Sequence, residues 1–194
     1  MTSAEAEPGG ATAVPASPRI KPLPVEEWDE RIRDLDLGEV MNAYQTVAHH
    51  PRLFRRWLLF AAQLLNDSAL PGRQREIVIL RTGWNCGSDY EWGQHVKMAR
   101  AEGVTDEEII RVTQGPHQPG WKPLDALLLM ATDEMCTDRV ISDSTYEALA
   151  SQLDVKQLLD LVFLVGHYEL VSMLLRTFRV ERDDGVTGVP FPTD

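Results

Sequence analysis

The sequence predicts an all-helical protein, and two observations carry this prediction. Across the middle of the chain, residues with high helix propensity dominate, and apolar residues recur at steps of three and four, which is the period of one buried helix face. The chain also has no convincing run of alternating apolar and polar residues and no βαβ spacing. A parallel sheet with a nucleotide-binding loop is therefore not expected.

Turn and capping residues divide this region into about eight helices. Pro51 suits the first turn of a helix, and Gly103 suits the position just past a helix end. Thr105 and Glu108 have the spacing of a capping box. The expected helices cover residues 25–35, 38–49, 51–65, 71–102 with a break near 83–87, 106–113, 121–136, 144–151 and 155–177.

Composition separates the helical region from the two ends of the chain. Residues 1–24 are rich in Ala, Gly, Pro and Ser, so we expect an arm that is flexible or lies extended on the body. Residues 25–182 form the expected helical domain. Residues 183–194 are interrupted by Gly and Pro and are expected to be an irregular tail.

Charge and cysteine content narrow the choice of partners. The chain has 194 residues and a formal net charge of −11, which repels phosphate backbones and argues against nucleic acid as a partner. Its N-terminus lacks the pattern of a signal peptide, and its uninterrupted apolar runs are shorter than the ~20 residues that span a bilayer. Cys86 and Cys136 are isolated from each other in sequence. We therefore expect a reduced, cytoplasmic setting without membrane association.

The segment 75–100 holds the residues that suggest chemistry. Glu91 and His95 are four residues apart, so a helix places both side chains on one face. A carboxylate beside an imidazole fixes the orientation of the ring and suits general acid–base catalysis. Glu76 lies on an otherwise apolar stretch, where a carboxylate is either at the rim or held in a pocket. A Glu–His pair with this spacing is also common on ordinary solvated helices.

The same segment resembles the core of the carboxymuconolactone decarboxylase and alkylhydroperoxidase D superfamily. In peroxidase members, a Glu is followed twelve residues later by a C-x-x-C, and a His follows the second Cys by four. Counting from Glu76, Ser88 and Glu91 stand at the two cysteine positions and His95 stands at the histidine position. The resemblance extends over about residues 37–178. It implies the alkylhydroperoxidase D-like helical fold and a homo-oligomer, either dimer, trimer or hexamer.

The departures from this motif bear on activity. Peroxide reduction through a disulfide needs one thiolate and a second thiol that resolves it. Cys86 lies two residues before the first motif position and has no resolving partner nearby in sequence, so an inert, partly buried cysteine is the expected interpretation. The spacing of Glu91 and His95 instead resembles the decarboxylase branch.

Other polar residues are candidates for binding a substrate. Ser88 and Tyr90 are expected to donate hydrogen bonds to a developing enolate or carboxylate. Arg81 is expected either to bind a substrate carboxylate or to pair with Glu76 in a purely structural contact. His167 lies in an apolar helix that approaches the site in this superfamily, although a histidine in such surroundings is usually part of the core.

Three functional hypotheses follow. The first is a lyase without cofactor or metal that acts on a small organic acid or lactone, with Glu76, Glu91 and His95 as catalytic residues. In it, His95 moves a proton at the substrate and Glu91 orients it, while Glu76 is a second acid or base or holds His95. The second is a thiol-dependent peroxidase that uses Cys86. The third is a non-catalytic, oligomeric ligand-binding protein that retains the fold.

Overall fold

The computed structural model describes residues 17–188, and within them every regular element is helical. The prediction of an all-helical protein is thus confirmed for this part of the chain. The elements, in order, are a short 3-10 helix η1 (Val25–Glu27) and the helices α1 (Glu30–Arg33), α2 (Asn42–Val47), α3 (Pro51–Asn66), α4 (Gly72–Asn85), α5 (Asp89–Ala101), α6 (Asp106–Gln114), α7 (Pro123–Asp138), α8 (Asp143–Ala150) and α9 (Val155–Phe178).

The first two predicted helices are shorter than expected. Asp29 caps α1 by accepting a hydrogen bond from the Arg31 backbone, so the segment predicted as one helix is divided into η1 and α1. Trp28 is extended between them and buried, and its indole N–H donates to the Leu23 carbonyl at 2.9 Å. Helix α2 begins only at Asn42. Tertiary contacts of Trp28 therefore override helix propensity here.

The predicted caps elsewhere are present. Thr105 and Glu108 form the capping box of α6, and Asp154 and Gln157 form a second one at the start of α9. The expected break in the long segment after Pro71 lies at Gly87, whose φ of +63° is in the left-handed region that favours glycine. This break turns the chain between α4 and α5 and lets the two helices pack side by side.

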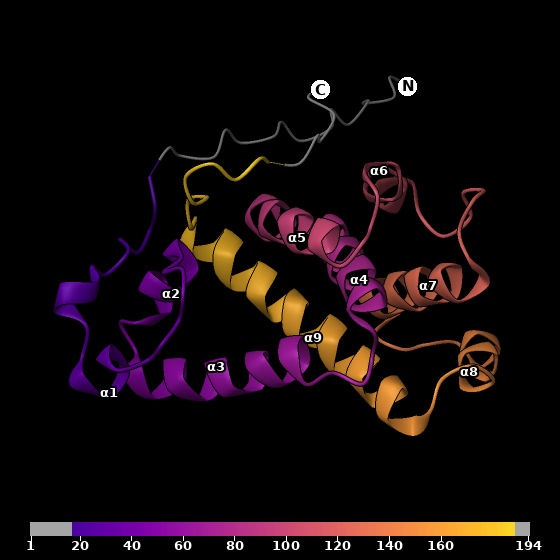
Figure 1. The fold of residues 1–194 in the computed structure, drawn as a ribbon, viewed down its shortest axis with the longest axis horizontal. Coiled ribbons are helices and arrows are strands. Elements are labelled where there is room, and N and C mark those ends of the chain that lie inside the picture. The colour runs from indigo at the N-terminus through magenta and orange to yellow at the C-terminus, as the bar shows by residue number, and fades with distance from the viewer. Residues whose placement is uncertain (1–16, 189–194) are drawn as a thin grey trace, which may run out of the picture.

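Helix α9 is the central element of the fold. It crosses the molecule obliquely, with α3 along one side and α4 and α5 across the other (Figure 1). Its buried residues include Leu161, Leu164 and Val165, which join the core formed with α4, α7 and α8. A second core cluster lies between α4, α5, α6 and α7. Helices α4, α5 and α9 together position the residues of the candidate site.

Helix α9 is also long and apolar enough, by length and composition alone, to span a membrane. Charged residues such as Asp160 and Glu169 interrupt its apolar runs, as the sequence indicated, but its mean hydropathy stays high. A core helix of a soluble protein meets the same criterion. The contacts of α9 with α3, α4, α5, α7 and α8 are those of such a core helix.

The first described residues lie against the end of α9, and the segment after α9 lies against α2 and α5. The backbone N–H of Arg19 donates to the Phe178 carbonyl at 2.8 Å, and the Arg19 guanidinium donates to the Thr177 carbonyl at 2.9 Å. Asp183 accepts a hydrogen bond from the Asn42 backbone at 2.7 Å. The predicted arm and tail extend further, over residues 1–16 and 189–194, which lie outside the described residues.

Candidate active site

A buried carboxylate–imidazole pair lies between α4 and α5. His95 Nδ1 is 2.8 Å from Glu76 Oε2, and the side chains of Glu76 and His95 are almost completely buried. Arg75 donates from Nε to the other Glu76 oxygen at 3.2 Å. Both oxygens of Glu76 therefore have partners. The contact crosses the break at Gly87, so the fold brings together two residues that the sequence separates.

Glu91 occupies a different environment one turn before His95. It is also buried, and its Oε2 accepts a hydrogen bond from the Ser172 hydroxyl of α9 at 2.9 Å. Its Oε1 has no hydrogen-bond partner within residues 17–188. Burial raises the pKa of Glu91 well above its ordinary value, and the bond from Ser172 offsets only part of this effect. This surrounding favours the protonated carboxyl.

The space for Glu91 is provided by a glycine. A Cβ atom placed on Gly83 of α4 would lie 3.2 Å from Glu91 Oε1, closer than side chains normally approach. Glycine at this position thus lets the Glu91 carboxyl rest against the α4 backbone. From the sequence, Glu91 was predicted to orient His95. In the structure, Glu76 holds the imidazole, and Glu91 is bound to Ser172 instead.

Tyr168 of α9 lies beside both acidic groups. Its ring meets the His95 ring edge to face, with centroids 4.8 Å apart. Burial raises the pKa of Tyr168 well above its ordinary value, and the charges of Glu76 and Glu91 add to this effect. Tyr168 is therefore a neutral phenol. It joins the Glu76–His95 pair and Glu91 into one buried cluster.

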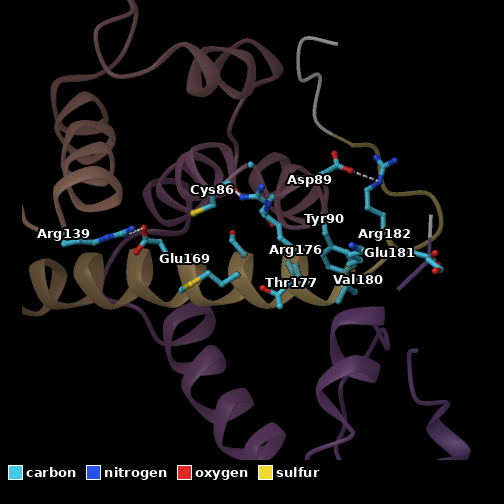
Figure 2. A pocket seen from close by; sticks show the side chains of 17 residues that line it. Cys86, Asp89, Tyr90, Arg139, Glu169, Arg176, Thr177, Val180, Glu181 and Arg182 are labelled. Atoms are coloured by element: carbon cyan, nitrogen blue, oxygen red, sulfur yellow. Dashed lines mark hydrogen bonds and ion pairs between the residues drawn. The ribbon is translucent and has the colours of Figure 1, made fainter. Parts of the chain in front are cut away.

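An open pocket of about 1550 Å³ lies on the other side of Ser172. It runs along α9 and is bounded by the end of α4 and the start of α5 (Figure 2). An ion pair of Arg139 with Glu169 stands at one end, and Arg182 pairs with Asp89 at 3.1 Å near the other. Ser88 and Ser172 line the pocket and are themselves buried, so they form part of its floor.

Arg176 is a cation placed to meet an anion in this pocket, which Arg179 also lines. The Arg176 guanidinium donates to the Cys86 carbonyl at 2.5 Å, and within residues 17–188 no carboxylate forms an ion pair with it. It is exposed on α9, one turn after Ser172. Remaining N–H donors of a planar guanidinium can bind a carboxylate through two hydrogen bonds.

The predicted binding residues Ser88 and Tyr90 have different surroundings. The Ser88 hydroxyl is buried without a hydrogen-bond partner in the described part of the chain and lies at the pocket floor. Tyr90 also lines the pocket, but its hydroxyl donates to the Asp183 carboxylate and accepts from the Ala43 backbone at 3.2 Å. Burial, followed by Asp183, raises the pKa of Tyr90. Tyr90 thus connects α5 to α2 and the tail.

Arg81 and His167 lie away from this pocket. Arg81 forms a two-point ion pair with Asp133 of α7, at 2.6 and 2.8 Å, rather than a pair with Glu76. His167 faces α3, where its ring stacks on Trp57 with centroids 6.2 Å apart. Both side chains are already engaged in packing α4 against α7 and α9 against α3. The geometry gives them structural roles.

Cys86 has a second cysteine, Cys136, as a neighbour, and the sequence spacing did not predict it. Cys86 ends α4 and lines the pocket, and the neighbouring Cys136 of α7 lowers the pKa of the Cys86 thiol to about 7. Both cysteines are free and half-buried. Linear spacing does not show this neighbour, because it depends on the packing of α4 against α7.

Comparison with known proteins agrees with this architecture. Residues 51–115 match the model of the carboxymuconolactone decarboxylase family. The fold is similar to the alkylhydroperoxidase AhpD core of a peroxidase-related protein from Ralstonia eutropha, with a TM-score of 0.77 and 19% identity over 89% of this chain and 95% of that one. It is also similar to a peroxidase-related protein from a Silicibacter species, with a TM-score of 0.71 and 14% identity over 94% and 97% of the two chains. The family match is confined to residues 51–115, and the structural likeness, at 19% identity or less, shows that this chain has the AhpD-like fold.

A third structural neighbour has the same fold and a different named activity. It is a cysteine-to-alanine variant of the debrominase Bmp8 in complex with 2,3,4-tribromopyrrole, with a TM-score of 0.72 and 10% identity over 87% of this chain and 94% of that one. No protein of curated function matches the sequence closely enough to add to the assignment. The shared fold therefore leaves the reaction open.

The superfamily motif accounts for only part of the candidate site. Glu76, Glu91 and His95 lie inside the matched segment, whereas Ser172, Arg176 and Cys136 lie outside it. The sequence does contain a signal for Ser172, which is a small polar residue on the buried face of an otherwise apolar helix. Arg176 follows it at the spacing of one helical turn.

Proposed function

We propose that the protein is an acid–base lyase, independent of a cofactor, that acts on a small organic acid bound in the pocket along α9. One observation carries the proposal: Glu91 is buried in surroundings that favour its protonated form, and its only hydrogen bond within the described chain leads to Ser172 at the pocket floor. A carboxyl group kept protonated by burial is a proton donor suited to an enolate.

Arg176 binds the substrate carboxylate in this proposal. Its guanidinium faces the pocket and has no carboxylate partner among the described residues. This assignment replaces Arg81, whose donors are occupied by Asp133 and the Val112 carbonyl. The Ser88 hydroxyl, buried without a partner, is available to donate a hydrogen bond to a developing enolate oxygen.

The proton step runs through Ser172. Loss of carbon dioxide from a β-keto or vinylogous acid leaves an electron pair on carbon, delocalised as an enolate, which then takes up a proton. When Glu91 is protonated, its 2.9 Å contact with Ser172 can run from the carboxyl O–H to the serine oxygen, and the serine O–H can point into the pocket. The substrate carbon gains the serine proton, the serine regains one from Glu91, and Glu91 is left as a carboxylate.

His95 restores the proton of Glu91 in the proposed cycle, with Glu76 as its positioning residue. Glu76 accepts a hydrogen bond from His95 Nδ1, which fixes the ring, and Arg75 donates to the other Glu76 oxygen. Tyr168 excludes water from the space beside the ring.

The test is turnover of γ-carboxymuconolactone by the full chain, compared with Glu91→Gln, His95→Gln and Ser172→Ala. We expect a fall of about 10²-fold or more for Glu91→Gln and for His95→Gln, because each removes a proton-transfer group. Activity of the parent should also decline as pH rises through the raised pKa of Glu91. Arg81→Lys is the matched control away from the pocket. Equal turnover by the parent and Glu91→Gln would contradict the proposal.

The cellular setting and the assembly remain predictions. Both thiols are free, as a reduced cytoplasmic protein requires. The predicted homo-oligomer has an available surface in the outer face of α9, where large apolar side chains are exposed on the single chain: Leu159, Val162, Phe163, Leu170 and Met173. A second copy presents the same apolar row, and light scattering would measure the assembly.

A further inference from the structure

The segment that follows α9, residues 180–188, forms one wall of the pocket, and we call it the strap. Its first residues, Val180, Glu181 and Arg182, line the pocket beside the start of α5 (Figure 2). The strap then runs alongside α5 (Figure 1). It contains no regular helix or strand, so only its contacts with the rest of the chain hold it in place.

Asp183 is the main anchor of the strap. Its carboxylate accepts hydrogen bonds from the Asn42 backbone at 2.7 Å, from the Gln94 side-chain amide at 2.5 Å and from the Tyr90 hydroxyl. These donors come from α2 and α5. Hydrogen bonds to a charged acceptor are stronger than those between neutral groups. One side chain therefore ties the strap to two helices.

A glycine on α5 provides the surface on which the strap rests. A Cβ atom placed on Gly93 would lie 2.5 Å from Val186 Cγ1 and 2.6 Å from the Thr187 carbonyl oxygen. The Val186 side chain can rotate away, but the Thr187 backbone cannot move without displacing the strap. Glycine inside a helix is otherwise unfavourable relative to alanine. Gly93 therefore suits the docking of the strap rather than the stability of α5.

The remaining contacts of the strap are weaker. Arg182 pairs with Asp89 at 3.1 Å, but the two side chains are 41% and 43% exposed, and exposed ion pairs contribute little. The Asn42 amide donates to the Glu181 carbonyl at 3.1 Å. No side chain in residues 180–188 is fully buried. A segment with so few buried contacts opens at a lower free energy than the body of the protein unfolds.

We propose that the strap is a lid that opens and closes one end of the pocket, with Asp183 as its latch. In the closed form, Glu181 and Arg182 stand at the pocket and restrict the entry of bulky molecules. Opening requires the release of Asp183 from its three donors and the lifting of the strap from Gly93, while α9 stays in place. The proposal rests on the pocket and the strap alone and does not depend on the lyase reaction.

The experiment measures opening and pocket access separately, in the Cys136→Ser background, where Cys86 is the only thiol. Hydrogen exchange of residues 180–188 reports opening. Alkylation of Cys86, which lines the pocket, by the bulky pyrenylmaleimide reports access. We expect Asp183→Ala to raise both rates by the same factor, about tenfold, which corresponds to the loss of one hydrogen bond to a charged group. The small N-methylmaleimide should react at an unchanged rate.

Asp184→Ala is the matched control, because Asp184 is the exposed neighbour of the latch. Gly93→Ala is the second test: alanine favours α5, so faster exchange in this variant would come from displacement of the strap and not from a weaker helix. Urea midpoints that stay at the parent value separate opening of the strap from global unfolding. Unchanged exchange in Asp183→Ala and Gly93→Ala would overturn the proposal. Faster exchange without faster reaction of pyrenylmaleimide would overturn it too, since the strap would then not control the pocket.

Discussion

Glu76 and Glu91 are two buried carboxyl groups with opposite electrostatic surroundings. Glu76 has a guanidinium on one oxygen and an imidazole on the other. Glu91 has one serine hydroxyl and an oxygen that no described residue binds. Both side chains are buried, but only Glu76 has a guanidinium partner, Arg75. Glu76 is therefore fixed by Arg75 and His95, whereas the surroundings of Glu91 favour its protonated form.

Glu76 and Glu91 also differ in how much they contribute to holding the helices together. Glu76 joins α4 to α5 through His95, so it has a structural function even if the protein has no catalytic activity. Glu91 contributes little to cohesion because its one hydrogen bond is to a neutral partner. A buried polar atom without a partner costs free energy in the folded state. Such a cost at a pocket floor is typical of a functional position.

Replacement of Glu76 should give the largest effect on stability. Glu76→Gln removes the charge that compensates Arg75 and accepts from His95, and it leaves the Arg75 guanidinium mostly buried beside a neutral amide. We expect the free energy of unfolding to fall by roughly 3 kcal/mol, at the low end for a broken buried ion pair. Urea denaturation followed by circular dichroism measures it. An exposed residue of α6, in the variant Glu107→Gln, is the control.

A loss below about 1 kcal/mol for Glu76→Gln would remove the distinction between the two carboxyl groups, because that is the range of an ordinary surface pair. In that case Arg75 would be sufficiently balanced by Glu102, its other ionic partner at 3.2 Å. The double variant with Arg75→Gln separates these possibilities. If the pair is coupled as we infer, the two losses should not add.

The comparison also shows how far the sequence alone leads. The position of Glu76, nineteen residues before His95, matches the superfamily motif, and the two side chains do meet. Local patterns also predicted most helices and caps, because capping depends on residues close in sequence. The partners of Glu91 and Cys86 were missed. Ser172 and Cys136 reach them only through the packing of α9 and α7 against α4 and α5, which no local pattern encodes.

We expect Glu91 to make the free energy of unfolding depend on pH. Its pKa in the folded protein is raised above the ordinary value of 4.5, so above pH 4.5 the folded state keeps a proton that the unfolded state has lost. Stability therefore falls as pH rises from 4.5 toward the raised pKa, by at most about 1.4 kcal/mol per pH unit. Glu91→Gln does not titrate and should lose this dependence.

The measurement is urea denaturation of the parent and Glu91→Gln at several pH values between 5 and 8. The free energy of unfolding of Glu91→Gln should rise steadily relative to that of the parent as pH increases. Glu76→Gln provides the comparison, since it removes a carboxylate whose two oxygens both have cationic or imidazole partners. Parallel curves for the parent and Glu91→Gln would mean that Glu91 is charged in the folded protein, and the proton-donor role would be lost with it.

His167 is expected to have the smallest effect on the free energy of unfolding. Its contribution is lost as pH falls, whereas that of Glu91 is lost as pH rises. Burial, assisted by the charge of His95, lowers the pKa of His167 to about 4, so below pH 6.5 the unfolded state binds a proton that the folded state resists. Stability from this residue is complete above pH 6.5 and declines as pH falls toward 4, by roughly 1–2 kcal/mol at pH 5. His167→Phe keeps the ring between Trp57 and Phe60 and should lose less stability than the parent between pH 7 and pH 5. An equal loss in both proteins would show that His167 titrates freely, and the acid sensitivity of the fold would then have to come from the carboxylates alone.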